Sequence, residues 1–312
     1  MLYTAACGEM EIIMKKLLIL LVLLILLSAC TSQDGPAYTP STDTNTSGEE
    51  TKAAYSDFDL DDTWDADAAT TIEFSGESAQ IDGDGAVLTE KTLRIDQEGT
   101  YVLQGEFSGS VQVSLTKTQK AQLVLNGVTI RCGDTAAIYI SSADKVAVTL
   151  AQGTENALYD GTDYVQKSGA EPNACLFSKD DLTINGTGSL TVFGNSNNGI
   201  GTKNDLKIVS GILSISASKN ALKGNDSVRI LGGSITAVIC ADGIKSDNEI
   251  EPDKGFVSIS GGTLDLNCTD DGIQAVTGVT ISEEASVRVH ADDKPVNCNG
   301  PVQIDAGCFT EK

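Results

Sequence analysis

The stretch that decides the fold is NGIGTKNDLKI at residues 198–208, which returns as NALKGNDSVRI at 220–230 and begins again as DGIKSDN at 242–248. In each copy an apolar residue lies two positions after an Asn or Asp. The equivalent position recurs at spacings of 24, 22, 22, 29 and 23 residues, and it holds in turn Leu176, Ile200, Leu222, Ile244, Ile273 and Val296. A nearly fixed period of about 22 residues predicts a solenoid of stacked repeats.

Each repeat contains short segments with the two-residue period of a β-strand. Apolar and polar residues alternate over 206–208, 213–217 and 264–268, and Ser-Gly or Gly-Gly pairs punctuate the strands. We therefore predict an all-β domain over residues 70–312, wound as a single-stranded parallel β-helix of roughly ten coils. The irregular segment 72–101 would form the first coils or a cap.

Composition and charge exclude several functions. The 312 residues include 44 acidic and 21 basic side chains, for a formal net charge of −23, and such a chain repels nucleic-acid phosphates. The single histidine, His290, argues against a His-rich metal site or a Ser-His-Asp triad. Only 5% of residues are aromatic, which predicts a thin aliphatic core and few stacking platforms for neutral sugars.

The N-terminus predicts an export signal. An unbroken apolar run at 17–27 follows Lys15 and Lys16 and ends in LSAC at 27–30. The run is too short to cross a bilayer and fits the hydrophobic part of a secretory signal. LSAC resembles a bacterial lipobox, in which cleavage precedes a lipidated cysteine. A secretory signal with an incidental cysteine is the alternative.

The lipobox defines the expected domain organisation. Residues 1–29 would be the signal peptide, with translation starting at Met14, and Cys30 would carry the lipid. The Ser-, Thr- and Asp-containing segment 30–69 would be a flexible linker. We expect a monomeric lipoprotein on the cell surface, which touches the membrane through its lipid anchor only.

Four segments, 173–181, 197–206, 220–226 and 242–247, resemble the clostridial carbohydrate-binding domain-containing lipoproteins. The resemblance covers most of residues 70–300. It implies a right-handed parallel β-helix related in shape to pectate lyases. It also implies binding of polygalacturonate and cellulose, together with structural calcium.

Stacked carboxylates make a candidate metal site. The position two residues before the repeated apolar residue becomes Asp242 and then Asp271, while Asp270 and Asp293 form a second step one residue earlier. Carboxylates one coil apart repel each other unless they are protonated or bridged by a cation, and calcium prefers such oxygen ligands. Asp247 and the acidic insertion after it, with Glu249, Glu251 and Asp253, could hold a second ion, although a solvated acidic loop is the favoured interpretation of this segment. Alternatively, Lys294 neutralises Asp271 and solvent screens the remaining charges.

A small basic strip is the candidate ligand site. The position after the repeated apolar residue holds Lys223, Lys245 and Gln274, and stacked lysines could bind the carboxylates of an acidic sugar. Charge pairing of these lysines with neighbouring Asp residues is the alternative.

Six cysteines follow the lipobox, at positions 132, 175, 240, 268, 298 and 308. We expect mostly free thiols, with Cys268 filling the core in the slot used by Ala217 and Ile239, and Cys240 pointing outward. No CxxC motif supports a zinc site.

Three functions remain open. The first is a non-catalytic, calcium-assisted binder of acidic polysaccharide such as polygalacturonate or pectin, with cellulose as the less favoured candidate ligand. The second is a calcium-dependent pectate-lyase-like eliminase that uses Lys245 as its base. The third is a structural surface adhesin. No catalytic residues are assigned, because no residue departs from the repeat pattern in a way that would supply a unique acid or base.

Overall fold

The computed structural model describes residues 54–162, 164 and 171–312. One helical turn, α3 (Asp57–Leu60), accompanies an otherwise all-β set of elements, which confirms the predicted class. The expected signal peptide, Cys30 and the linker up to residue 53 lie outside the described residues. No helix in the described part of the chain is long and apolar enough to cross a membrane.

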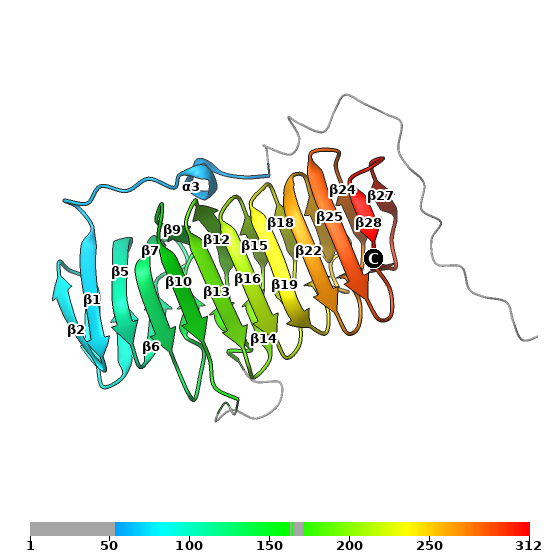
Figure 1. Cartoon of the computed structure of the whole chain (residues 1–312). Coiled ribbons are helices and arrows are strands. Elements are labelled where there is room, and N and C mark those ends of the chain that lie inside the picture. The colour runs from blue at the N-terminus through cyan, green and yellow to red at the C-terminus, as the bar shows by residue number, and fades with distance from the viewer. Residues whose placement is uncertain (1–53, 163, 165–170) are drawn as a thin grey trace, which may run out of the picture. The chain divides into compact units, whose positions relative to one another are not determined.

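Three strands recur in each repeat, and each pairs in parallel with its equivalents in the neighbouring repeats (Figure 1). The first ladder consists of β4 (Thr92–Ile95), β6 (Ser110–Ser114), β8 (Ile138–Ser142), β11 (Ala174–Ser178), β14 (Asn198–Thr202), β17 (Leu222–Gly224), β20 (Ile244–Ser246), β23 (Ile273–Ala275) and β26 (Val296–Cys298). The second ladder contains β9 (Lys145–Leu150), β12 (Asp181–Gly186), β15 (Asp205–Ile208), β18 (Ser227–Ile230), β21 (Phe256–Ile259), β24 (Gly278–Ile281) and β27 (Val302–Ile304). The third contains β10 (Glu155–Tyr159), β13 (Ser189–Gly194), β16 (Ile212–Ala217), β19 (Ser234–Cys240), β22 (Gly262–Cys268), β25 (Ala285–Ala291) and β28 (Phe309–Glu311).

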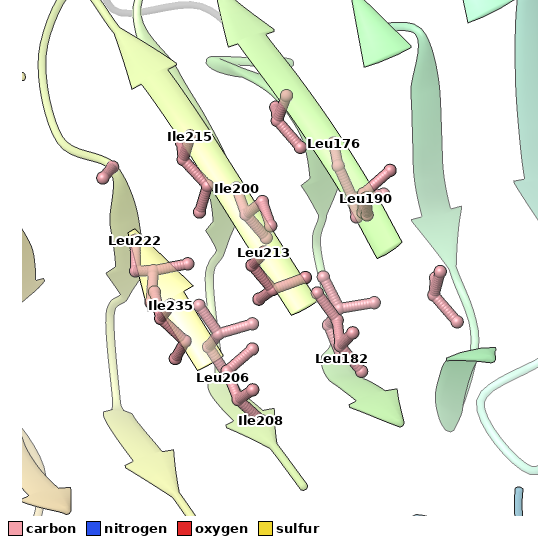
Figure 2. Packing of buried hydrophobic residues seen from close by; sticks show 14 of the residues in the cluster. Leu176, Leu182, Leu190, Ile200, Leu206, Ile208, Leu213, Ile215, Leu222 and Ile235 are labelled. Carbon is pink, nitrogen blue, oxygen red and sulfur yellow. The ribbon is translucent and has the colours of Figure 1, made fainter. Parts of the chain in front are cut away.

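The core is a column of aliphatic side chains enclosed by the three ladders. Leu222 pairs with Ile200 on one side and Ile244 on the other, and Ile244 pairs with Ile273, so the predicted inward stack is confirmed. Each of these side chains is at most 1% exposed. Figure 2 shows Ile200, Leu206 and Leu213, one from each ladder of the same repeat, together in this interior.

Antiparallel hairpins distinguish the first strands from the later repeats. β1 (Thr70–Gly76) pairs antiparallel with β2 (Ser78–Asp82), and β3 (Ala86–Thr89) pairs antiparallel with β4. β5 (Gly99–Phe107) and β7 (Lys120–Arg131) are long strands that pair in parallel with each other, and β7 also pairs in parallel with both β9 and β10. The irregular sequence at 72–101 therefore belongs to a cap.

A β-bulge in β19 corrects the expected orientation of Cys240. The register with β22 shifts between Ala237 and Cys240, so that Cys240 pairs with Cys268. Cys240 is consequently buried at 2% exposure, while Ile239, expected to point inward, is 57% exposed. The extra residue of a bulge reverses which side chains face the core.

The end of the expected linker is part of the folded domain. Residues 54–69, here called the strap, contact the second ladder, and Figure 1 shows α3 beside β12. Asp59 is 0% exposed and accepts hydrogen bonds from Lys145 on β9 and Lys207 on β15. The expected linker over 30–69 thus differs from the structure in its last part, because this carboxylate finds its partners on strands far along the chain.

Candidate functional site

Three carboxylates meet at the turns that lead into β20 and β23. Asp242 and Asp271 each lie two residues before a paired isoleucine, Ile244 and Ile273, so the ladder register places them at equivalent positions. The turn after β22 runs over residues 269–272, whereas the turn after β19 runs over only 241–243. The longer turn provides room for the additional carboxylate of Asp270.

The ligand oxygens of Asp242, Asp270 and Asp271 all lie within 4.8 Å of one another. Asp242 is 4% exposed and Asp271 is 2% exposed, while Asp270 lies at the surface. The pKa of Asp270 is raised by desolvation and by the negative charges of Asp242, Asp271 and Asp293. The cluster is therefore a concentration of negative charge that is only partly neutralised by its surroundings.

Hydrogen bonds fix the two buried carboxylates. Asp242 accepts from Lys245 Nζ at 3.1 Å through one oxygen and from the backbone N–H of Asp271 at 3.3 Å through the other. Asp271 Oδ2 accepts from Asn297 Nδ2 at 2.6 Å and from Gln274 Nε2 at 3.1 Å. Asp271 Oδ1 is also buried, and it has no hydrogen-bond partner among the described residues.

The other two expected metal ligands lie apart from this cluster. Asp293 is exposed in the next turn, where its backbone N–H donates to the carbonyl of Asp270 at 3.2 Å. Its charge acts on Asp270, but its carboxylate is outside the group of three. Asp247 follows β20 and forms an ion pair with Lys223 at 2.6 Å. Of the five candidates, the structure therefore brings three together.

The basic strip has the predicted stack. Lys223 pairs with Lys245 in register, and Lys245 pairs with Gln274. Both lysines are engaged in ion pairs, with Asp247 and Asp242 respectively. The charge-pairing alternative therefore describes this strip better than a strip of free positive charge.

Asn297 is a site residue that the sequence reasoning missed. It pairs with Gln274, so it continues the row of Lys223, Lys245 and Gln274 by one more repeat. Following that row to its last member would have found it. Lys294, which the alternative interpretation paired with Asp271, contacts Asn297 Oδ1 at 3.4 Å. An amide thus occupies the place where the sequence suggested a counter-charge.

The six cysteines within the described residues are all buried and unpaired. The Sγ atoms of Cys240 and Cys268 are 3.7 Å apart. A hydrogen bond with Cys240, together with burial, raises the pKa of the Cys268 thiol. Cys240 and Cys268 end the two strands that lead into the turns carrying the three carboxylates.

Comparisons with known proteins identify the family to which this chain belongs. The sequence profile described as "Carbohydrate-binding domain-containing protein" matches residues 89–306. A protein of the same description from Acetivibrio thermocellus is 43% identical over 247 residues, which cover 78% of this chain and 86% of the relative. A solved structure described as the polysaccharide lyase-like protein from C. thermocellum, a gadolinium derivative, is 42% identical with a TM-score of 0.76, and the match covers 78% of this chain and 99% of that one. The resemblance seen in the repeats is confirmed, and the chain belongs to the family of carbohydrate-binding domain-containing proteins.

Proposed function

We propose that this protein binds acidic plant polysaccharide, polygalacturonate or pectin, without catalysis, and that calcium held by Asp242, Asp270 and Asp271 assists the binding. The observation that carries the proposal is the unpartnered Oδ1 of Asp271. This oxygen is buried within a group of three carboxylates, in a chain of a carbohydrate-binding family.

The three residues fit a calcium ion by chemistry and by spacing. Calcium takes carboxylate oxygens at about 2.3–2.6 Å, so two ligands of one ion lie at most about 5 Å apart. The oxygens of the cluster lie within 4.8 Å of one another, which is inside this limit. A buried carboxylate oxygen without a partner is unfavourable, and a hard cation is the kind of group that satisfies it.

The negative charges of both the protein and the polysaccharide favour a bridging cation. The chain carries a formal net charge of −23, and polygalacturonate carries a negative charge on each sugar. The protein and the polysaccharide therefore repel each other within a Debye length, about 8 Å at physiological ionic strength. Lys223 and Lys245 are both ion-paired, which leaves them poorly suited to bind a further anion. When bound, calcium supplies the positive charge that a uronate carboxylate requires.

A polysaccharide lyase is the second candidate, because the solved relative is described as polysaccharide lyase-like. An eliminase needs a base to remove the C5 proton of the uronate. Lys245 lies beside the carboxylates, but its Nζ is ion-paired with Asp242 at 3.1 Å, and the equivalent residue one repeat earlier is also a lysine. His290 is exposed on β25, in the third ladder, and pairs with Asn267. These features favour binding over turnover.

We also propose the wider setting suggested by the sequence. The parallel ladders support a right-handed single-stranded parallel β-helix, and the LSAC motif supports a lipoprotein displayed on the cell surface from Cys30. Fractionation of a Cys30→Ala variant tests the anchor. Loss from the membrane fraction is expected, and unchanged membrane association would contradict lipidation at this residue.

The binding proposal is tested by retention on insoluble pectin, with and without a calcium chelator, and with cellulose as the comparison ligand. Chelation and Asp271→Asn should each abolish retention on pectin, while the pair Lys223→Ala plus Lys245→Ala should weaken it less. Calorimetric titration of calcium into the wild type and into Asp271→Asn gives a readout independent of sugar. Thermal melts of each variant show that the fold is retained.

Two results would overturn parts of the proposal. Retention that survives excess chelator but is lost in the double lysine variant would place the ligand on the basic strip. Release of unsaturated uronides that absorb in the ultraviolet, lost in Lys245→Ala, would make the protein a lyase.

A further inference from the structure

Two buried thiols face each other across neighbouring repeats. Cys240 ends β19 and Cys268 ends β22, and the two residues pair directly in the ladder. Their Sγ atoms lie 3.7 Å apart, and the residues are 2% and 3% exposed. Among the described residues, no other strand pairing places one cysteine opposite another.

The backbone at this pair already suits a disulfide. Disulfides join residues whose Cα atoms are about 4.4–6.8 Å apart, and neighbouring strands of a sheet are spaced about 4.8 Å apart. Bond formation therefore requires a change in side-chain rotamers that closes the sulfur separation to about 2 Å, without separating the strands.

The pairing depends on the bulge in β19. Without the register shift between Ala237 and Cys240, Ile239 would occupy the inward position and the thiol would face solvent. The bulge therefore turns the Cys240 thiol inward, opposite Cys268 on β22. This is the only place in the described ladders where one thiol lies opposite another. A bulge that re-aims one side chain is a recurrent feature of specialised positions in sheets.

We propose that Cys240 and Cys268 are a disulfide-forming pair that links the two repeats carrying the acidic cluster when the protein meets an oxidant. The oxidant is a small-molecule disulfide such as oxidised glutathione. The two S–H bonds break and one S–S bond forms, and the two protons and two electrons reduce the oxidant to two thiols. The proposal concerns the chain's own sulfurs and does not depend on the proposed function.

Burial determines when the reaction occurs. Because both thiols are almost inaccessible in the folded state, exchange with a dissolved disulfide is expected mainly during folding or transient opening. The link closes a loop between residues 28 positions apart. Restricting the unfolded chain in this way should lower the unfolding equilibrium constant by roughly two to three orders of magnitude.

The test is refolding of the full chain from denaturant with oxidised glutathione, followed by alkylation of the remaining thiols and peptide mapping without reduction. The expected result is a linked peptide pair joining Cys240 to Cys268, which dithiothreitol converts into two separate alkylated peptides. Oxidised protein should also require more denaturant for unfolding than reduced protein. Cys240→Ser and Cys268→Ala should each lose both effects, while Cys298→Ser, which removes a buried thiol that lies opposite Ala275, should keep them.

Two outcomes would overturn the proposal. One is alkylation of both Cys240 and Cys268 after oxidative refolding to a native circular dichroism spectrum. The other is a linked peptide in which either residue joins a different cysteine. The wild-type map decides the question even if a variant fails to fold.

Discussion

The carboxylate of Asp59 should hold the strap on the domain. The Asp59→Asn variant keeps the size of the side chain and removes its charge. In the structure this carboxylate is 0% exposed and accepts from Lys145 Nζ at 2.8 and 2.9 Å, from Lys207 Nζ at 3.2 Å and from Thr183 Oγ1 at 2.5 Å. The substitution would take from two ammonium groups, 8% and 7% exposed by residue, the charged carboxylate that accepts their hydrogen bonds.

Removing one partner of a buried ion pair costs about 3–5 kcal/mol. The strap is attached at one end of the domain, so it can detach and allow water to reach both lysines. The loss in the free energy of unfolding is then limited to the stabilisation that strap docking provides. We therefore expect about 3 kcal/mol, at the lower end of that range.

Urea denaturation gives the free energy of unfolding, and hydrogen exchange read by mass spectrometry shows where the chain opens. In Asp59→Asn the amides of residues 54–69 should lose protection while those of the aliphatic core keep it. Asp57→Asn is the matched control, because it removes an exposed carboxylate from the same helical turn and should change stability by less than about 0.5 kcal/mol. A loss below about 1 kcal/mol in Asp59→Asn, with the strap still protected, would refute the assignment of a buried ionic anchor.

Three further predictions follow from burial, sterics and charge. Burial alone would raise the pKa of Asp59, but hydrogen bonds from Lys145 and Thr183 outweigh it and hold that pKa below its ordinary value of 3.8. A carboxyl whose pKa is lower in the folded state than in the unfolded state stabilises the protein at pH values above the unfolded-state pKa, about 3.9. This stabilisation is lost as the pH falls through the folded-state pKa. The difference in the free energy of unfolding between wild type and Asp59→Asn should therefore become smaller in measurements at progressively lower pH. Ile244→Ala, at a position 0% exposed, should cost about 2–5 kcal/mol in urea titrations, whereas Ile250→Ala, at 92% exposure, should cost almost nothing. Gly272→Ala should lower the thermal unfolding midpoint by several degrees, because the added methyl would lie 2.3 Å from a valine methyl and 2.5 Å from a proline carbonyl oxygen. Gly133→Ala is the control: its methyl would have no atom within 4 Å, so the midpoint should stay unchanged.

The sequence alone was sufficient to predict the repeat and to predict which residues stack on one another in neighbouring repeats. In stacked parallel repeats each side chain lies on its equivalent one repeat away, so a period read along the chain is already a map of contacts. The Ile200, Leu222, Ile244 and Ile273 stack follows from this rule, and so does the meeting of Asp242 with Asp271. The same rule, followed one repeat further, leads to Asn297.

Tertiary structure alone decided what departs from the period. One inserted residue in β19 turned Cys240 inward, and a local reading cannot distinguish a bulge from a regular strand when both Ile239 and Cys240 are compatible with the core. The composition of the strap is typical of a linker, yet Asp59 is buried because Lys145 and Lys207, more than 80 residues away in sequence, are aligned by the second ladder. The period along the chain determined which residues stack within the repeats, and three-dimensional folding determined which distant charges and thiols meet.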